Sequence, residues 1–442
     1  MPKIVACKSN QPGGDGNDHF DPLRRVSGRP PPRRVIRGRF PVSSAMQRPG
    51  WWRGELLLLY ASMTIARVGF GVMLILFPSY LVRVSSITLA VVLALYPVLE
   101  ASSSVPMGVL CDTKGRRRIF LAGLGSMGCL IASVSLTQNL EVVAALHAMM
   151  GVAAAAITVS SLTMITDLTD PKNRGKGMGT FDFSNIGGYA AGLLLGGRLS
   201  ETFQSHLGDG FLVTGSVTLA ALAVSFFLLR EPAHSAHLGR TSFNPLGALD
   251  ARTKAVLPIW LSLTSLIGVV FFLPRALRDV GVQTTVTGNL LFVGIITIGV
   301  GSIGFGALSD RLGRERTMAI GVVGLFLLLV GLALVFQNFT QPRFLRFLPI
   351  LGPAGIATSA LVPSVLAAVG DRAKGEDRGA TMGLYSLMLS LGIALGELLA
   401  GFASALGGLP VILYAGSIFF LAASLVTFYL LSRVKELPPV PA

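Results

Sequence analysis

The stretch GVLCDTKGRRR runs from Gly108 to Arg118, and a variant of it, GALSDRLGRER, runs from Gly306 to Arg316. Both copies place a glycine, an aspartate, a second glycine and a group of basic residues at the same spacing. A second stretch, 151–179, is repeated as 355–383 with its glycines, an aspartate and an arginine in register. Chance does not align this much, so the chain contains two homologous halves.

The composition indicates which solvent surrounds these halves. Charged residues make up only 13% of the 442 residues, whereas ordinary globular proteins contain about 25%. Hydrophobic residues make up 52%, and the mean hydropathy is +0.66. A soluble fold of this size would lack the polar residues to cover its surface, so the apolar side chains must face a lipid bilayer.

Apolar runs long enough to cross about 30 Å of hydrocarbon follow one another from Glu55 onward, separated by short polar turns. We therefore predict an all-α membrane protein with twelve transmembrane helices in two homologous six-helix bundles. The predicted spans are 55–82, 86–110, 116–136, 141–167, 176–200, 209–230, 255–280, 284–309, 316–337, 345–370, 378–405 and 409–432.

The basic residues sort by side of the predicted membrane. The net charge is +15, and most of the 37 Lys and Arg residues lie in the N-terminal segment and in the turns after even-numbered spans. The positive-inside rule therefore predicts cytoplasmic N and C termini. Because the positive charge is spread over short turns, we expect no nucleic-acid partner. The opposite side holds only Arg83, Arg198, Arg275, Arg278, Arg343 and Arg346.

Composition also divides the chain into four parts. Residues 1–52 are rich in Pro, Gly and Arg, which predicts a disordered cytoplasmic tail. An organellar transit peptide, or a true start at Met46, would also explain this segment. The first six-helix bundle is expected at 53–230 and the second, with a short cytoplasmic tail, at 255–442. The segment 231–254 is the predicted cytoplasmic central loop.

The repeated turn resembles a family motif. Over residues 53–435 the chain is similar to the major facilitator superfamily, which carries G-x-L-x-D-x-x-G-R-[RE]-R after helix 2 and, here, again after helix 8. The motif content is closest to the drug and metabolite efflux members. The resemblance implies alternating access by two helix bundles. It also implies that the turn is a cytoplasmic latch and that helices 1, 4, 7 and 10 line a central cavity.

The glycines of the turn have physical roles of their own. Gly108 and Gly306 are expected to let neighbouring helices approach closely. Gly115 and Gly313 are expected to permit the tight backbone that joins two helices.

The charged residues of the turn complete the predicted gate. Asp112 and Asp310 would lie at the membrane edge, where a carboxylate can face a helix N-terminus or a basic neighbour. Arg116, Arg311 and Arg314 belong to the same predicted gate. For Arg117, Arg118 and Arg316, a role in setting topology alone is an equal alternative.

Two further motifs of the family occur in altered form. Many members have R-x-x-Q-G in helix 4, whereas this chain has His147-Ala-Met-Met-Gly151, so a titratable histidine replaces a permanent cation. Drug/proton antiporters have G-P-x-x-G-G in helix 5, whereas this chain has Gly192-Leu-Leu-Leu-Gly196-Gly197. The glycine face without the proline favours close helix packing.

Few ionisable residues lie inside the predicted spans, and each is a candidate functional residue because charge is costly there. Arg67 in helix 1 and Glu100 in helix 2 lie about 18 and 15 Å from the cytoplasmic side at 1.5 Å per residue, a depth at which they could meet. A static ion pair and a substrate-binding or proton-linked pair are equal alternatives.

Three other ionisable residues lie inside the spans. Glu397 in helix 11 is interpreted either as a proton or substrate carboxylate or, toward the outer half of its helix, as a solvated residue. His147 would titrate near neutral pH or serve as a neutral packing side chain. Asp182 lies near the cytoplasmic end of helix 5, where we expect an inner-gate or capping role.

The resemblance also suggests polar residues that line the cavity. Such a lining, sparse in charge, suits an amphipathic or weakly polar solute, although hydroxyl side chains in spanning helices often bond their own backbone. The candidates are Trp260 in helix 7 and the hydroxyl residues Thr158, Ser161, Ser262, Ser265, Thr358 and Ser359.

These features imply a secondary transporter of a small organic solute, driven by the proton gradient, with efflux favoured over uptake. An uptake symporter or facilitator for a metabolite or sugar, and a sensor that does not transport, are the alternatives. No G-x-x-x-x-G-K-[ST] stretch occurs, which argues against a nucleotide-driven pump, and no residue spacing favours a metal site or an enzyme. We expect no cofactor, a monomer, and a location in the plasma (inner) membrane.

Overall fold

The computed structural model describes residues 54–169, 174–231, 251–370 and 378–435, and in these ranges all regular structure is helical. The predicted tail 1–52 and nearly all of the predicted central loop lie outside them. The helices are α1 (Gly54–Tyr80), α2 (Ser86–Lys114), α3 (Arg116–Val134), α4 (Leu140–Leu168), α5 (Arg174–Thr202), α6 (Leu207–Leu228), α7 (Ala251–Asp279), α8 (Thr284–Leu312), α9 (Arg314–Gln337), α10 (Gln341–Thr358), α11 (Leu361–Gly370) and α12 (Arg378–Lys435).

Single glycines join α2 to α3 and α8 to α9. Gly115 has φ 94° and Gly313 has φ 91°, a region that side chains with a Cβ rarely adopt. The N–H of Gly115 bonds to the carbonyl of Cys111, and that of Gly313 bonds in the same way to Ser309. The repeated sequence therefore folds into the same turn twice. We call the end of the helices that carries these turns the motif end, and the other end the opposite end.

The predicted span 345–370 is two helices rather than one. α10 ends at Thr358, and the N–H groups of Ser359 and Ala360 bond to carbonyls three residues earlier, of Ile356 and Ala357. Pro363 explains this break, because proline has no N–H to donate four residues back and its ring crowds that carbonyl. The stretch Pro342–Leu366 is still long and apolar enough to cross a membrane, so the predicted span contains a break in the helix.

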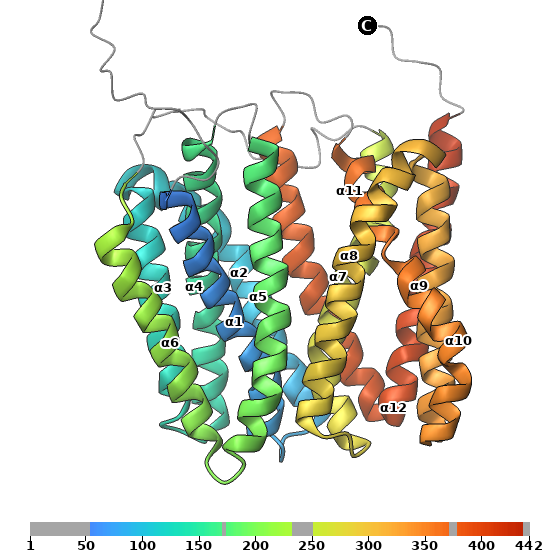
Figure 1. Ribbon diagram of the computed structural model, residues 1–442, viewed down its shortest axis with the longest axis horizontal. Coiled ribbons are helices and arrows are strands. Elements are labelled where there is room, and N and C mark those ends of the chain that lie inside the picture. The colour runs from blue at the N-terminus through green and yellow to red at the C-terminus, as the bar shows by residue number, and fades with distance from the viewer. Residues whose placement is uncertain (1–53, 170–173, 232–250, 371–377, 436–442) are drawn as a thin grey trace, which may run out of the picture. The chain divides into compact units, whose positions relative to one another are not determined.

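The predicted spans 378–405 and 409–432 form the two limbs of α12. Gly407 and Gly408 have non-helical backbone angles, and Gly408 has φ 69°. The break lies at the predicted boundary, and it reverses the chain at the opposite end, where Figure 1 shows the sharp turn of α12.

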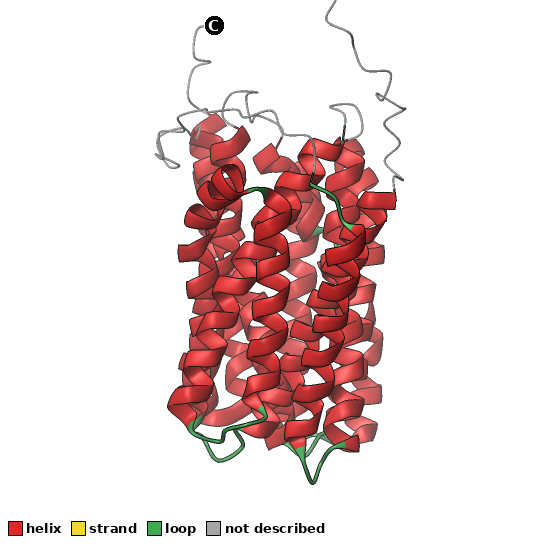
Figure 2. Cartoon of the chain, turned by 90° about the vertical axis from the view of Figure 1, so that its left-hand side faces the viewer, coloured by secondary structure: helices red, strands yellow, loops and turns green. Residues whose placement is uncertain are grey.

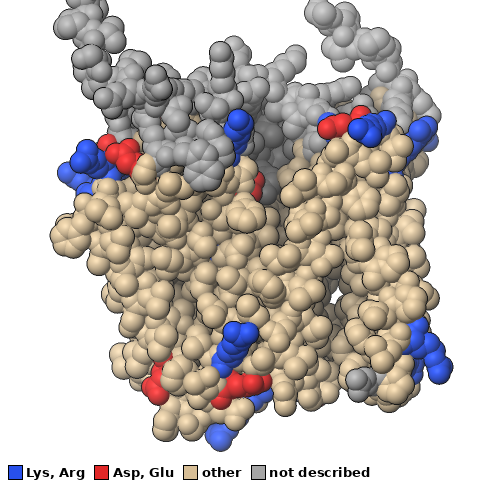
Figure 3. Space-filling view, viewed as in Figure 1, with Lys and Arg blue, Asp and Glu red and all other residues tan. Residues whose placement is uncertain are grey.

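Ten helical stretches within the described residues are long and apolar enough to cross a membrane by length and composition. One of them, Leu387–Val434, contains 48 residues and includes the turn between the limbs of α12. α5 has 29 residues but is more polar and is not among the ten. In Figure 3 the charged side chains in view gather toward the two ends, with a wide uncharged surface between them.

The helices lie roughly side by side, with their connections at the two ends (Figures 1 and 2). Figure 1 shows α1–α6 together on the left and α7–α12 together on the right. We call these the first and second helix groups. Contacts between α2 and α12, between α5 and α8, and between α1 and α7 join them.

Glycines allow close helix approaches both within a group and between the groups. A Cβ on Gly192 of α5 would overlap the backbone of α1 at Val68, so the helix 5 glycines pack as expected. A Cβ on Gly288 of α8 would overlap the carbonyl oxygen of Leu193 in α5. α5 is thereby wedged between α1 of its own group and α8 of the other.

Candidate functional site

In the first predicted gate turn, Arg116 and the N-terminus of α3 find their partners within the first helix group. Arg116 lies 2.6 Å from Asp167 of α4 and 3.7 Å from Asp112, whose side chain is 64% exposed. Glu231, just beyond α6, accepts hydrogen bonds from the backbone N–H groups of Arg116 and Arg117 at 2.7 and 3.0 Å. These groups are the free donors of the α3 N-terminus, where a carboxylate is favoured.

The second gate turn is simpler. Arg314 pairs with Asp310 at 2.5 Å, and the Asp310 side chain is 66% exposed. Arg311 is exposed as well. A Cβ added to Gly108 would lie 4.0 Å from its nearest contact and one added to Gly306 would lie 3.8 Å away. These are ordinary contacts, so the close helix approach expected at the two glycines is absent.

Arg67 of α1 lies in the centre of a polar network. Its Nε donates to Asn185 at 2.7 Å, and its two terminal nitrogens donate to the hydroxyls of Tyr189 and Thr158 at 2.8 and 2.6 Å. A terminal nitrogen also lies 3.9 Å from Glu100. The structure thus brings the predicted pair together, and the network joins α1, α2, α4 and α5.

A cavity lies beside this network, between the two helix groups. Phe70, Tyr96 and Tyr189 of the first group and Phe271 of the second form its aromatic wall. The ring of Phe70 lies 4.5, 5.4 and 5.7 Å from those of Tyr96, Tyr189 and Phe271, measured between centroids. Such distances are typical of packed aromatic pairs. The ionisable residues that line the cavity are Glu100, His147 and Glu397.

Two buried polar atoms at this cavity have no hydrogen-bond partner among the described residues. They are Nδ1 of His147 and Oε2 of Glu397. The two residues are only 4% and 2% exposed. Buried polar groups are nearly always hydrogen-bonded, so unpartnered atoms at one cavity make it the candidate site for a polar ligand. The prediction that Glu397 is a solvated residue is wrong, because its helix face packs against the other helix group.

The structure does not bring every candidate to this cavity. Trp260 is buried in the packed core of α7, and Asp182 is exposed on α5. α10 does not line the cavity either, and the Thr358 hydroxyl bonds to Ala354 within α10. The walls come instead from α1, α2, α4, α5, α7 and the first limb of α12.

Glu100 and Thr158, two partners of Arg67, were among the predicted candidates. The other two partners, Asn185 and Tyr189, and the rest of the aromatic wall were missed by the sequence reasoning. A signal existed for two of them. Tyr96 precedes Glu100 by four residues, and Tyr189 follows Asn185 by four residues, so each pair shares one helix face. Two polar residues one helical turn apart inside an apolar span were therefore the sequence signal that could have predicted these positions.

Hydrogen bonds tie the two helix groups together at the opposite end. Arg275 and Arg278 of α7 donate to the carbonyls of Leu81 and Ser79, at the end of α1, at 3.4 and 3.2 Å. These carbonyls carry the negative end of the α1 dipole.

Glu201, at the end of α5, forms another tie. Its Oε1 accepts the backbone N–H of Thr285 in α8 at 3.0 Å. The hydrogen bonds from Thr285 hold the pKa of the Glu201 carboxyl below its usual value. This tie therefore persists at neutral pH and is lost only as the pH falls through that lowered pKa.

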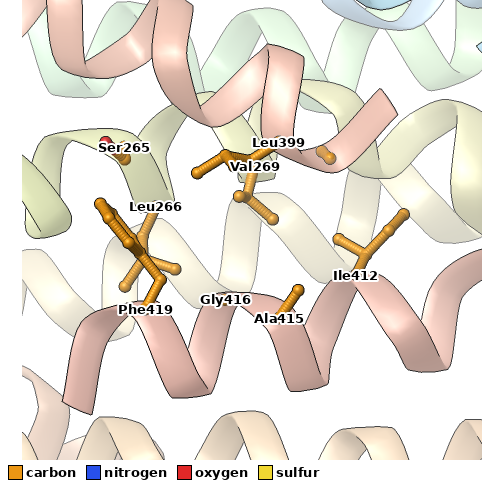
Figure 4. A pocket seen from close by; sticks show the side chains of 9 residues that line it. Ser265, Leu266, Val269, Leu399, Ile412, Ala415, Gly416 and Phe419 are labelled. Atoms are coloured by element: carbon orange, nitrogen blue, oxygen red, sulfur yellow. The ribbon is translucent and has the colours of Figure 1, made fainter. Parts of the chain in front are cut away.

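A second cavity lies inside the second helix group, between α7 and the two limbs of α12 (Figure 4). Leu266, Val269 and Phe419 project into it. The hydroxyl of Ser265 at its rim donates to the carbonyl of Leu261 at 2.8 Å. An apolar gap of this kind offers no group that orients a polar solute, so we assign it to packing.

Comparison with known proteins identifies the family to which the chain belongs. The family described as Major Facilitator Superfamily matches residues 56–351 and 259–442. The chain belongs to the Major Facilitator Superfamily. It is therefore a multi-pass integral membrane protein of a transporter family, and the likeness inferred from the repeated turn is confirmed.

Relatives of known sequence are named as multidrug resistance proteins. The chain is 29% identical over 292 residues to the multidrug resistance protein MdtG of Dickeya zeae (strain Ech586), covering 62% of this chain and 67% of that protein. It is 23% identical to MdtG of Escherichia coli O9:H4 (strain HS), covering 71% of this chain and 79% of that protein.

Solved superfamily structures share the fold. A bacterial homolog of the human lysosomal transporter Spinster, inward-facing and unoccupied, matches with a TM-score of 0.73 at 16% identity, covering 87% of this chain and 98% of that one. The nucleoside transporter NupG matches with a TM-score of 0.67 at 12% identity, covering 87% and 100%. At these identities the likeness shows the fold alone.

Proposed function

We propose that this superfamily member exports a small organic solute in exchange for protons, by rocking its two helix groups about the central cavity. The cavity lies between the groups, so their rocking would open one binding site first to one side of the membrane and then to the other. The relatives named as multidrug resistance proteins support export. The protein works as a monomer in this proposal, because both walls of the cavity belong to one chain.

We further propose that the motif end and both termini face the cytoplasm of a bacterial inner membrane. The excess of Lys and Arg at that end supports this orientation. The ties at the opposite end then close the outer side, which is the arrangement of a carrier that takes up solute from the cytoplasm.

Glu397 is the group that carries the coupled proton. Its Oε2 is buried and has no partner within the described part of the chain, and a charge in that position is costly unless a proton or a cation joins it. Arg67, beside the cavity, is already held by Asn185, Tyr189, Thr158 and Glu100. A proton and a solute therefore compete for one carboxylate, and that competition links their movements.

The test is flux in proteoliposomes with an imposed pH gradient and a panel of organic solutes. We expect gradient-driven solute movement in the native protein and loss of its gradient dependence in Glu397→Gln. Glu141→Gln is the matched control, because Glu141 is an exposed carboxylate in the first turn of α4. Flux by the native protein that ignores the gradient would favour a facilitator, and absence of any flux would favour a sensor.

A further inference from the structure

The protonated nitrogen of His147 can be assigned from the neighbouring helix. Pro97 of α2 has no N–H, so the carbonyl of Leu93 lacks the helical partner it would have four residues later. The imidazole of His147 hydrogen bonds to the backbone of Leu93. A carbonyl only accepts, so the imidazole nitrogen that meets it carries the hydrogen. Because Nδ1 has no partner among the described residues, that nitrogen is Nε2, and Nδ1 is left as a bare acceptor.

Glu397 supplies a second acceptor from the other helix group. A Cβ on Gly268 of α7 would overlap the backbone of α12 at Ile393 and Glu397, which therefore lie directly against α7. On the other side, Gly151 of α4 accommodates the carbonyl of Tyr96 in the same way. Close backbone packing thus sets the positions of both acceptors, one on each side of the cavity.

The rest of the cavity is apolar and aromatic. Phe271 lies 5.7 Å from Phe70 and 6.1 Å from Tyr189 between ring centroids, so rings of both groups meet at the wall. Aromatic faces attract cations and pack against apolar bodies. Because Arg67 and Glu100 offset one another, ionised Glu397 leaves the cavity with a net negative charge.

We propose that this cavity binds the ammonium group of a primary amine on an aromatic or apolar body, with His147 Nδ1 and Glu397 each accepting one of its N–H donors. The ammonium group supplies one positive charge and three donors. The inference rests on the proposed export function, since it names the solute class of the same cavity. Each ammonium that leaves Glu397 is replaced by one proton, so charge is conserved in the exchange.

Two probes that share a body separate this inference from general cation binding. They are 4-phenylbutylammonium and its N,N,N-trimethyl analogue, which keeps the charge but has no N–H. Binding of each to the purified protein is measured by calorimetry in detergent. We expect the primary amine to bind about tenfold or more tightly, the value of one hydrogen bond between charged partners. Equal affinity, or preference for the trimethyl analogue, would overturn the inference.

Variants of His147 supply the second readout. His147→Phe keeps a ring but removes the acceptor, so the ratio of the two affinities should fall toward one, whereas His147→Gln should restore part of it. Glu397→Gln should weaken both probes. If His147→Phe does not fold, the ratio in the native protein still decides.

Transport distinguishes the two proposals. Discrimination between the probes without proton-driven flux would keep the solute class and refute the exchange. Proton-driven flux of other solutes, with no discrimination between the probes, would do the reverse.

Discussion

At the scale of the residue, Arg67 directs its donors to the protein itself. Three hydrogen bonds of 2.6 to 2.8 Å hold the guanidinium to Asn185, Tyr189 and Thr158, and Glu100 lies 3.9 Å away. A guanidinium with so many fixed partners has little left for a solute. Of the two alternatives for this pair, the geometry favours a static link between helices.

This assignment predicts that Arg67→Met destabilises the protein more than Arg67→Met combined with Glu100→Gln. The single variant leaves Glu100, whose side chain is 17% exposed, without a cation, which costs up to about 3–5 kcal/mol, whereas the double variant leaves no charge. Unfolding of the purified proteins in one detergent measures the difference. Equal stability of the single and double variants would show that the ion pair is unimportant, and loss of solute binding by a folded double variant would favour the substrate role.

At the scale of the element, α5 and α8 form one of the contacts between the helix groups. Gly288 of α8 faces the carbonyl of Leu193, and Gly197 of α5 faces the backbone of Thr284. Closer to the motif end, α8 contains Gly299, where an added Cβ would meet nothing within 4 Å. The two helices are therefore in close contact at the opposite end and apart at Gly299.

We expect Gly288→Ala to push α5 and α8 apart at the opposite end, because the added methyl overlaps the α5 backbone. Gly299→Ala is the matched control in the same helix and should have little effect. Spin labels at Leu136 and Phe339, both exposed turn residues at that end, report the separation in a variant without the native cysteines. An unchanged distance distribution in Gly288→Ala would contradict this account of the contact.

At the scale of the whole molecule, the two ends differ in how the helix groups are held. Arg275 and Arg278 cross from α7 to the end of α1 at the opposite end. At the motif end, Asp112 pairs with Arg116 of its own group and remains mostly exposed. The latch that the family resemblance implies would engage Asp112 in the alternate state, when the motif end closes.

Two variants should therefore shift the equilibrium between this state and the alternate state in opposite directions. Arg278→Ala removes a tie of this state and should lengthen the distance between labels at Leu136 and Phe339. Asp112→Asn weakens the alternate state, so it should keep that distance short and slow transport while solute binding persists. Wild-type transport rates in Asp112→Asn would refute the latch, and an unchanged distance in Arg278→Ala would refute the tie.

The sequence by itself determined the features that depend on local chemistry and on the bilayer. The repeated turn predicted Gly115 and Gly313, whose positive φ follows from the need for one residue to join two helices. Apolar runs predicted the helices, because backbone groups in lipid must bond internally. The break in the α12 helix at Gly407 and Gly408 lay between two predicted spans, where the apolar runs end.

Only the tertiary structure decided which candidates share a site. Glu397 and His147 lie in different repeats, and helical periodicity places a side chain on a face without saying what that face meets. The partners of Arg67 likewise depend on how α1 packs against α4 and α5. Burial and hydrogen bonding are set by neighbours distant in sequence, so the acceptor pair at the cavity exists only once the two helix groups are packed together.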